Sequence, residues 1–274
     1  MIFNNINNDK LMFVYRYQQV PDDTEYQIHA HSCFELIYLI SGDITFYIEG
    51  RIYHPKPRDI IIFNKLDMHK TVINSKVPYE RIVIRIKKDF FSEFDPEHKM
   101  FSVFNSSEPS KVNLIRPSDF GDDYWENCLK KIIAEKNNSS IHINSYLIPF
   151  LNEIRIILEN SEKLIRSKKE LAEQIIEYIN FHLSTDLTPE RIAESFYISR
   201  SKLDKLFRKN TGSSIVEYIT AKRLVMARGL LLDGKKPTDV YLRCGFKDYS
   251  TFYRTYKQKF GVSPKQDAKK PTEK

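Results

Sequence analysis

The chain has 274 residues and a formal net charge of +7, and this length is enough for about two domains. Its three cysteines, Cys33, Cys128 and Cys244, are widely spaced and form no CxxC pair, which argues against a disulfide framework or a zinc finger and predicts a reducing compartment. No stretch approaches about 18 uninterrupted apolar residues, and residues 1–8 lack a basic segment followed by an apolar run, so we predict a cytoplasmic protein that does not enter a membrane.

Residues 11–86 show the period of two that is typical of β-strands. Ile44, Phe46 and Ile48 alternate with other residues, and similar short runs are separated by Gly, Pro, Asn and Asp. Several short strands with such turns favour a β-sandwich or a β-barrel. We therefore predict a β-domain over residues 1–112.

Two helical patterns follow within residues 113–165, over 124–136 and 141–159. Apolar residues three and four positions apart give each pattern a broad apolar face. Pro149 predicts a kink or a boundary within the second pattern. Such a helix pair is usually part of a core, and we treat residues 113–165 as a helical segment between two domains.

The remaining residues, 166–274, contain one short sequence motif twice. Residues 201–208 return as residues 250–257, at a constant offset of 49. Two copies are too few for a solenoid, so the repeat indicates a duplicated module. Ser199 and Asp248 stand just before the two copies, where their side-chain oxygens suit the N-cap of a helix.

Each copy is predicted to be the second helix of a helix-turn-helix unit. Thr188 and Pro189 start a short helix before the first copy, and Gly245 suits the turn before the second. Residues 215–232 form one long amphipathic helix between the units, about 27 Å in length. Major grooves on one side of a duplex lie about 34 Å apart, so this connector suits two reading helices in neighbouring grooves.

The basic charge belongs to this repeated part. Residues 169–274 contain 21 Lys and Arg against 13 Asp and Glu, a net charge of +8, whereas residues 1–168 have a net charge of −1. A solvated basic surface would give the same excess. Together with two helix-turn-helix units, the excess favours neutralisation of nucleic-acid phosphates.

Residues 171–264 resemble the DNA-binding domain of the AraC/XylS family of transcription regulators. The matching residues are Ile192, Ala193, Ser199, Leu203, Phe207, Gly212, Tyr218, Ile219, Arg223, Leu224, Ala227, Leu230, Leu231, Gly245, Phe246, Asp248, Tyr256, Lys257, Gly261, Ser263 and Pro264. Tyr241 replaces the family's usual small Ala, so we expect the second unit to pack differently or more loosely. Tyr256 is a mild change of aromatic residue, and Asp267 and Ala268 replace a closing Tyr-Arg, which predicts a frayed last turn.

The β-domain resembles the cupin barrel that serves as the sensor of many such regulators. The matching residues are His29, His31, Glu35 and Gly42, then Pro57, Arg58, Asp59 and His69, although Arg58 replaces a usual Gly. In a strand, His29, His31 and Glu35 share one face, and His69 would join them from a neighbouring strand. In metal-binding cupins the matching residues hold a metal ion, for which these groups are apt. We favour a metal-free ligand pocket over a metal site or ordinary packing, and we expect no metal and no cofactor.

These resemblances imply an α+β multidomain protein: a cupin-like barrel, a helical linker or dimerisation segment, and an all-α domain with two helix-turn-helix units. They imply a sequence-specific regulator, an activator and not an enzyme, that acts as a homodimer with RNA polymerase and senses a sugar or other metabolite. The alternatives are a constitutive DNA-binding regulator without a ligand, and a metal-dependent cupin enzyme fused to a DNA-binding domain.

Residue chemistry assigns the DNA contacts. The candidates for base contacts are Ser201, Asp204, Lys205, Ser250, Thr251, Tyr253 and Arg254, and those for phosphate contacts are Arg200, Lys202, Arg208 and Lys257. Lys205 and Arg254 are equivalent under the 49-residue offset, and Arg254 suits the O6 and N7 of a guanine. Asp204 either accepts from a cytosine or orients Lys205 or Arg208.

Overall fold

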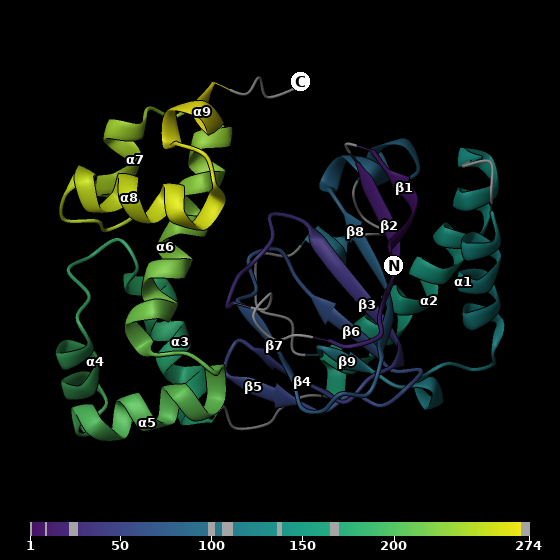
Figure 1. Cartoon of the computed structure of the whole chain (residues 1–274), viewed down its shortest axis with the longest axis horizontal. Helices are drawn as coiled ribbons and strands as arrows, with labels where there is room; N and C mark the ends of the chain where they lie inside the picture. Colours follow the sequence, from purple (N-terminus) through teal and green to yellow (C-terminus); the bar gives the residue numbers. More distant parts are fainter. Residues whose placement is uncertain are drawn as a thin grey trace.

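The computed structural model describes residues 2–8, 10–21, 27–97, 102–105, 112–135, 139–164 and 170–269. Within them the chain forms a β-rich part followed by helices (Figure 1). The predicted boundary between residues 165 and 166 falls outside the described residues. Of the helices in these ranges, none is both long and apolar enough to span a membrane.

The strands form two antiparallel sheets, in the orders β1-β2-β8-β3-β6-β9 and β5-β4-β7. Their bounds are β1 Ile2–Asn7, β2 Leu11–Gln18, β3 Phe34–Ser41, β4 Ile44–Ile48, β5 Arg51–Tyr53, β6 Ile60–Phe63, β7 His69–Ile73, β8 Tyr79–Ile86 and β9 Leu114–Ile115. The prediction of a β-rich N-terminal domain is confirmed. Among the described strands, no ladder joins the two sheets, so the cupin-like barrel is an open sandwich.

The helices follow the same chain order. Their bounds are α1 Tyr124–Ala134, α2 Ser140–Leu164, α3 Leu171–His182, α4 Pro189–Ser195, α5 Arg200–Thr211, α6 Ile215–Leu232, α7 Pro237–Arg243, α8 Tyr249–Phe260 and α9 Pro264–Ala268, with short 3₁₀ turns η2 Lys88–Glu93, η3 Ser102–Asn105 and η4 Pro117–Asp119. We call α4 and α5 the first unit, and α7 and α8 the second unit. Figure 1 shows α6 running between α3–α5 and α7–α9.

The six-stranded sheet is buried on both faces at its central strands β3 and β8. Leu39 and Val83 belong to a core cluster with Phe46 of the small sheet. Leu36 and Ile84 belong to a second cluster, which also contains buried residues of α1 and α2. The resulting layers are α1 and α2, the large sheet, the small sheet and then the C-terminal helices (Figure 1).

The two predicted helices of the middle segment are present as α1 and α2. Of the two alternatives predicted at Pro149, a kink or a boundary, the boundary is excluded, because α2 continues through the proline. Leu147 and Phe150 are fully buried on either side of the proline, in the cluster shared with the sheet. Packing therefore keeps both halves of α2 on one core despite the hydrogen bond that proline cannot donate.

Arg58 stands where the second cupin motif usually has a glycine, and its contacts explain how the turn accepts it. It has a φ of 76°, in the region where glycine is normally favoured. Its guanidinium donates to Asp123 at 2.7 Å and to Glu126 at 2.9 Å, at the start of α1. The side chain that strains this turn also fastens α1 to the sheet.

Tyr241 is partly buried and packs against the core of the second unit. Its ring meets Tyr249 edge-on at 5.6 Å between centroids and stacks on Phe252 at 6.4 Å. The second unit thus packs around an extra aromatic ring, which is the first of the two outcomes predicted for this residue.

The predicted fraying after Pro264 is wrong. The chain forms α9, and the side chain of Asp267 is fully buried. Tyr256 donates its hydroxyl to Asp267 Oδ2 at 2.7 Å, and Arg228 Nε lies 3.2 Å from the same oxygen. Two of the departures from the family pattern, Tyr256 and Asp267, are therefore bonded to each other.

Replacing Tyr256 by phenylalanine should lower the free energy of unfolding by about 1–3 kcal/mol, because a buried carboxylate oxygen loses its donor. Urea denaturation measures this loss. Tyr249→Phe serves as the control, since that ring is only partly buried. Equal stabilities of the two variants would contradict the role given to the hydroxyl.

Candidate functional site

The reading helices α5 and α8 are equivalent in structure as well as in sequence. Each has 12 residues. The side chains of Ser199 and Asp248 accept a hydrogen bond from the backbone N–H three residues later, which confirms both predicted N-caps. Each helix ends at a glycine in the left-handed region, Gly212 with a φ of 64° and Gly261 with a φ of 72°.

The side chains predicted to contact DNA lie on the outer side of both helices. Leu203 and Phe207 of α5 are fully buried, as are Phe252 and Tyr256 of α8. Of the candidates for base contacts, Ser201, Lys205, Ser250, Tyr253 and Arg254 are exposed, and Asp204 and Thr251 are partly exposed. Of the candidates for phosphate contacts, Lys202, Arg208 and Lys257 are exposed, and Arg200 is partly exposed. Their contacts with DNA stay predictions.

Asp204 is paired with Arg200, and not with the residues considered from sequence. Arg200 Nε donates to Asp204 Oδ2 at 2.9 Å, one helical turn away. Arg200 also donates to Glu190 of α4. Two carboxylates therefore bind Arg200, the residue that the sequence analysis assigned to a phosphate contact. Asp204 is placed to orient Arg200 at the start of α5.

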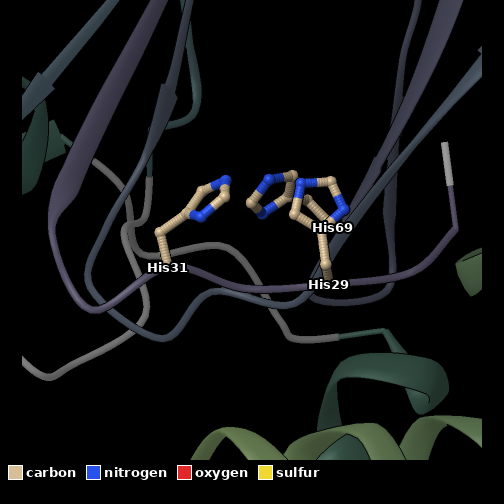
Figure 2. A group of neighbouring side chains, drawn as sticks. All are labelled: His29, His31 and His69. Atoms are coloured by element: carbon tan, nitrogen blue, oxygen red, sulfur yellow. The ribbon is translucent and has the colours of Figure 1, made fainter. Parts of the chain in front are cut away.

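The three histidines of the β-domain form a compact cluster (Figure 2). One ring nitrogen of each lies within 4.8 Å of the corresponding nitrogens of the other two. The Nδ1 atoms of His29 and His69 lie 2.7 Å and 2.8 Å from the carbonyl oxygens of Gln27 and Asp67, so each Nδ1 carries the hydrogen of that bond. The three rings lie together as expected, but the strand predicted to carry His29 and His31 is wrong, because β3 begins at Phe34 and both residues precede it.

Glu35 connects the histidines to a residue that the motif did not include. Its Oε2 lies 3.1 Å from His31 Nε2 and 3.5 Å from His69 Nε2. Arg85 donates Nε to Glu35 Oε1 at 2.8 Å, and its Nη2 lies 3.0 Å from His31 Nε2. Burial lowers the pKa of His29 to about 3 and also lowers the pKa of His31. Although burial opposes it, the contacts with His31 hold the pKa of Glu35 well below its usual value.

A metal ion of the cupin kind fits this cluster only in part. Three imidazole nitrogens converge, as a transition-metal site requires. However, Arg85 is permanently charged and already contacts both His31 and Glu35, so a divalent cation bound there would lie against a guanidinium. Arg85 thus supplies the positive charge of the cluster, which favours the metal-free alternative.

Replacing Arg85 by methionine should cost about 3 kcal/mol of folding free energy, because a buried carboxylate loses its cation. Chemical denaturation measures this loss. The matched control is Arg155→Met, which breaks the Arg155–Glu159 pair on α2, where Glu159 is 42% exposed; this change should cost less than about 1 kcal/mol. Similar losses in both variants would refute the role of Arg85.

The same arrangement predicts the response to metals. Adding Zn²⁺ or Ni²⁺ to purified, chelator-treated protein should leave its melting temperature unchanged, since Arg85 competes for the cluster. A rise of several degrees that disappears in His69→Ala, and persists in the control His142→Ala, would instead establish a metal site.

A cleft of about 640 Å³ lies between the β-domain and the C-terminal helices. It is lined by Gln27, Ile28 and Lys70 of the β-domain, by Arg208, Gly212, Ser213, Val216, Glu217, Thr220, Ala221 and Leu224 around α5 and α6, and by Thr255, Gln258 and Lys259 of α8. The predicted pocket residues His29, His31, Glu35 and His69 do not line it, and Glu35 and His69 are each 3% exposed. This cleft was not anticipated from sequence, because its walls come from distant segments.

Two family descriptions match the chain. An AraC-like ligand binding domain matches residues 13–99, and a helix-turn-helix domain matches residues 192–270. Together these ranges include more than half of the 274 residues.

Similar proteins include named transcriptional activators. The activator RhaS of Enterobacter sp. (strain 638) is 26% identical over 136 residues, covering 48% of this chain and 49% of the relative. The lactose operon transcription activator of Staphylococcus xylosus is 29% identical over 140 residues, covering 49% of each. The chain thus spans about half the length of these curated relatives.

Among solved structures, unsaturated fatty acid bound ToxT of Vibrio cholerae is similar to this chain, with 15% sequence identity and a TM-score of 0.44. The alignment covers 97% of this chain and 98% of the ToxT chain. The two matched domains, in this order, agree with the sandwich and with the duplicated helix-turn-helix described above. The chain belongs to the AraC family of transcriptional regulators.

Proposed function

We propose that this protein binds duplex DNA in a sequence-specific manner by placing α5 and α8 in neighbouring major grooves. The duplication carries the proposal: two capped helices of 12 residues expose equivalent residues and are joined by the 18-residue helix α6. Lys205 and Arg254 stand at the same position of the two copies, and both are exposed. Side chains of this kind read the edges of guanines.

Selection of bound duplexes from a random pool tests this function. The purified full chain should enrich one bipartite motif, with half-sites about one helical turn apart. Its affinity for the enriched duplex should exceed its affinity for bulk competitor by at least about a thousandfold. Enrichment of no motif at moderate ionic strength would sink the proposal.

A small-molecule effector is part of the proposal, and the interdomain cleft is its best-supported site. Lys70, Arg208 and Lys259 line the cleft, so an anionic metabolite suits it better than a neutral sugar. A ligand there would touch the β-domain and both reading helices at once. Thermal-shift screening of sugars, sugar phosphates and carboxylates tests this, with Lys259→Met and Lys70→Met expected to remove any response. A constitutive regulator would respond to none of them.

We also propose a cytoplasmic activator that works with RNA polymerase, since two similar proteins are named activators. A homodimer belongs to the same proposal, but the apolar face of α2 predicted as its contact packs on the large sheet. Ile141 of α2 is 86% exposed and suits a contact outside that core. Sedimentation of wild type and Ile141→Glu tests whether α2 contributes to a dimer.

A further inference from the structure

The turn between β4 and β5 has unusual chemistry. Ile48 pairs with Arg51, so Glu49 and Gly50 form a two-residue hairpin turn with φ values of 45° and 83°. Two positive φ values define the type I′ turn, in which Asn or Gly is preferred at the first position. A glutamate is disfavoured there, so its surroundings must hold it.

The surroundings of Glu49 come from both domains. Its Oε1 accepts from the backbone N–H of Met68 at 2.6 Å and from Lys222 Nζ at 2.8 Å, and its Oε2 accepts from the hydroxyl of Tyr218 at 3.1 Å. Tyr218 and Lys222 are one turn apart on α6. Glu49 is 9% exposed and Lys222 is 13% exposed, so a nearly buried ion pair joins the β-domain to α6.

The residues beside Glu49 fasten α3 to the same turn. Arg51 donates Nε and Nη2 to the two carboxylate oxygens of Glu173, at 3.0 Å and 2.9 Å. Gly50 packs so closely on α3 that a Cβ there would lie 2.7 Å from Ile176 Cδ1. The hairpin is therefore fitted in shape as well as in charge to the C-terminal domain.

A third contact reaches the end of the first reading helix. Lys70 Nζ donates to the carbonyl oxygen of Gly212, the C-cap of α5, at 2.9 Å, and the ring of Tyr47 lies beside the same glycine. Arg208, a candidate for phosphate contact, lines the cleft with Lys70. The docked β-domain thus occupies the space next to the C-terminal end of α5.

The joint also contains an unfavourable charge. Asp67 is 3% exposed, and burial followed by the negative charge of Glu49 raises its pKa to about 7. Two buried carboxyl groups therefore lie close enough to repel each other, and Lys222 bonds to one of them, Glu49. Such a contact holds the domains together and is also poised to open.

We propose that the β4–β5 turn is an autoinhibitory latch, in which Glu49 binds Tyr218 and Lys222 and keeps the end of α5 against the β-domain. This inference rests on the proposed DNA-binding function. When the latch opens, the β-domain leaves the space beside the C-terminal end of α5, so a DNA backbone can approach Arg208, which is already exposed there. The disfavoured glutamate is retained in the turn because its carboxylate makes the interdomain contact.

The variant Glu49→Asn distinguishes the interdomain role of Glu49 from a role in the hairpin turn itself. Asparagine suits the first position of a type I′ turn, so the hairpin itself should be at least as stable, while the interdomain ion pair is lost. The wild-type chain should unfold in one calorimetric transition, and Glu49→Asn in two, with a larger hydrodynamic radius before unfolding. A single transition at an unchanged or higher temperature would overturn the latch.

Lys222→Met and the double variant complete the test. If Glu49 and Lys222 act together, the double variant should behave like either single variant, and independent effects would contradict their pairing. Arg155→Met on α2 is the control for loss of an ion pair within one domain, and it should leave a single transition.

Binding to the selected duplex distinguishes a latch from a passive contact. Glu49→Asn and Lys222→Met should each tighten binding by at least about fivefold, while Arg155→Met should not. Undocking without tighter binding would overturn autoinhibition. If no duplex binds even to wild type, the proposed function fails, whereas the calorimetric result still reports on docking.

Discussion

Replacing Gly245 by alanine is expected to lower the free energy of unfolding by about 3 kcal/mol or more and to abolish DNA binding. Gly245 has a φ of 78° between α7 and α8. A Cβ there would lie 2.6 Å from the carbonyl oxygen of Leu183 and 2.9 Å from the guanidinium of Arg223. Arg223 of α6 itself donates to the carbonyl of Leu183 at the end of α3, so the turn before α8 has no room to move away from either residue.

Gly229→Ala is the matched control for this change. Gly229 lies within α6, where an added Cβ meets nothing within 4 Å. Because alanine favours a helix over glycine, this variant should gain up to about 1 kcal/mol. Urea denaturation of both variants measures the difference in the free energy of unfolding. Near-equal stabilities would show that the turn before α8 tolerates a side chain at position 245.

Replacing Arg254 by alanine is expected to weaken binding to the selected duplex by about 1–3 kcal/mol and to relax the preference at one base pair. The reason is that Arg254 is exposed on α8, where two parallel N–H donors can meet the O6 and N7 of a guanine. Fluorescence anisotropy with duplexes that differ at each position of the motif measures both effects.

Lys257→Ala is the control for Arg254→Ala. Lys257 is exposed on the same helix and is assigned to a phosphate, so its loss should weaken every duplex alike and reduce the salt dependence of binding. If Arg254→Ala also weakened specific and random duplexes equally, its assignment to base reading would be wrong.

The architecture of the C-terminal domain was largely predictable because its signals are local. Ser199 and Asp248 announce the starts of α5 and α8, and their caps depend on residues three positions away. The alternation of Phe46 and Ile48 similarly predicts a strand with one buried side. The cupin motif also predicted that four residues form one cluster, namely His29, His31, Glu35 and His69.

The other parts of the site depend on contacts between segments that lie far apart in the sequence, and the periodicity of apolar residues does not predict such contacts. Arg85 meets Glu35 because β8 pairs with β3, and nothing in the sequence fixes that pairing. The pairing of Glu49 with Lys222 joins residues 173 positions apart. The only local signal for it was a glutamate in a Glu-Gly turn, where asparagine would fit the backbone better.

The bond between Tyr256 and Asp267 has a consequence for building hybrids of this protein with its relatives. Importing a foreign α8 with phenylalanine at position 256 removes a hydroxyl that bonds the buried Asp267, and importing a foreign chain end without the carboxylate removes the acceptor of the buried Tyr256 hydroxyl. Crossover points for such hybrids therefore belong before α8 and not between α8 and α9.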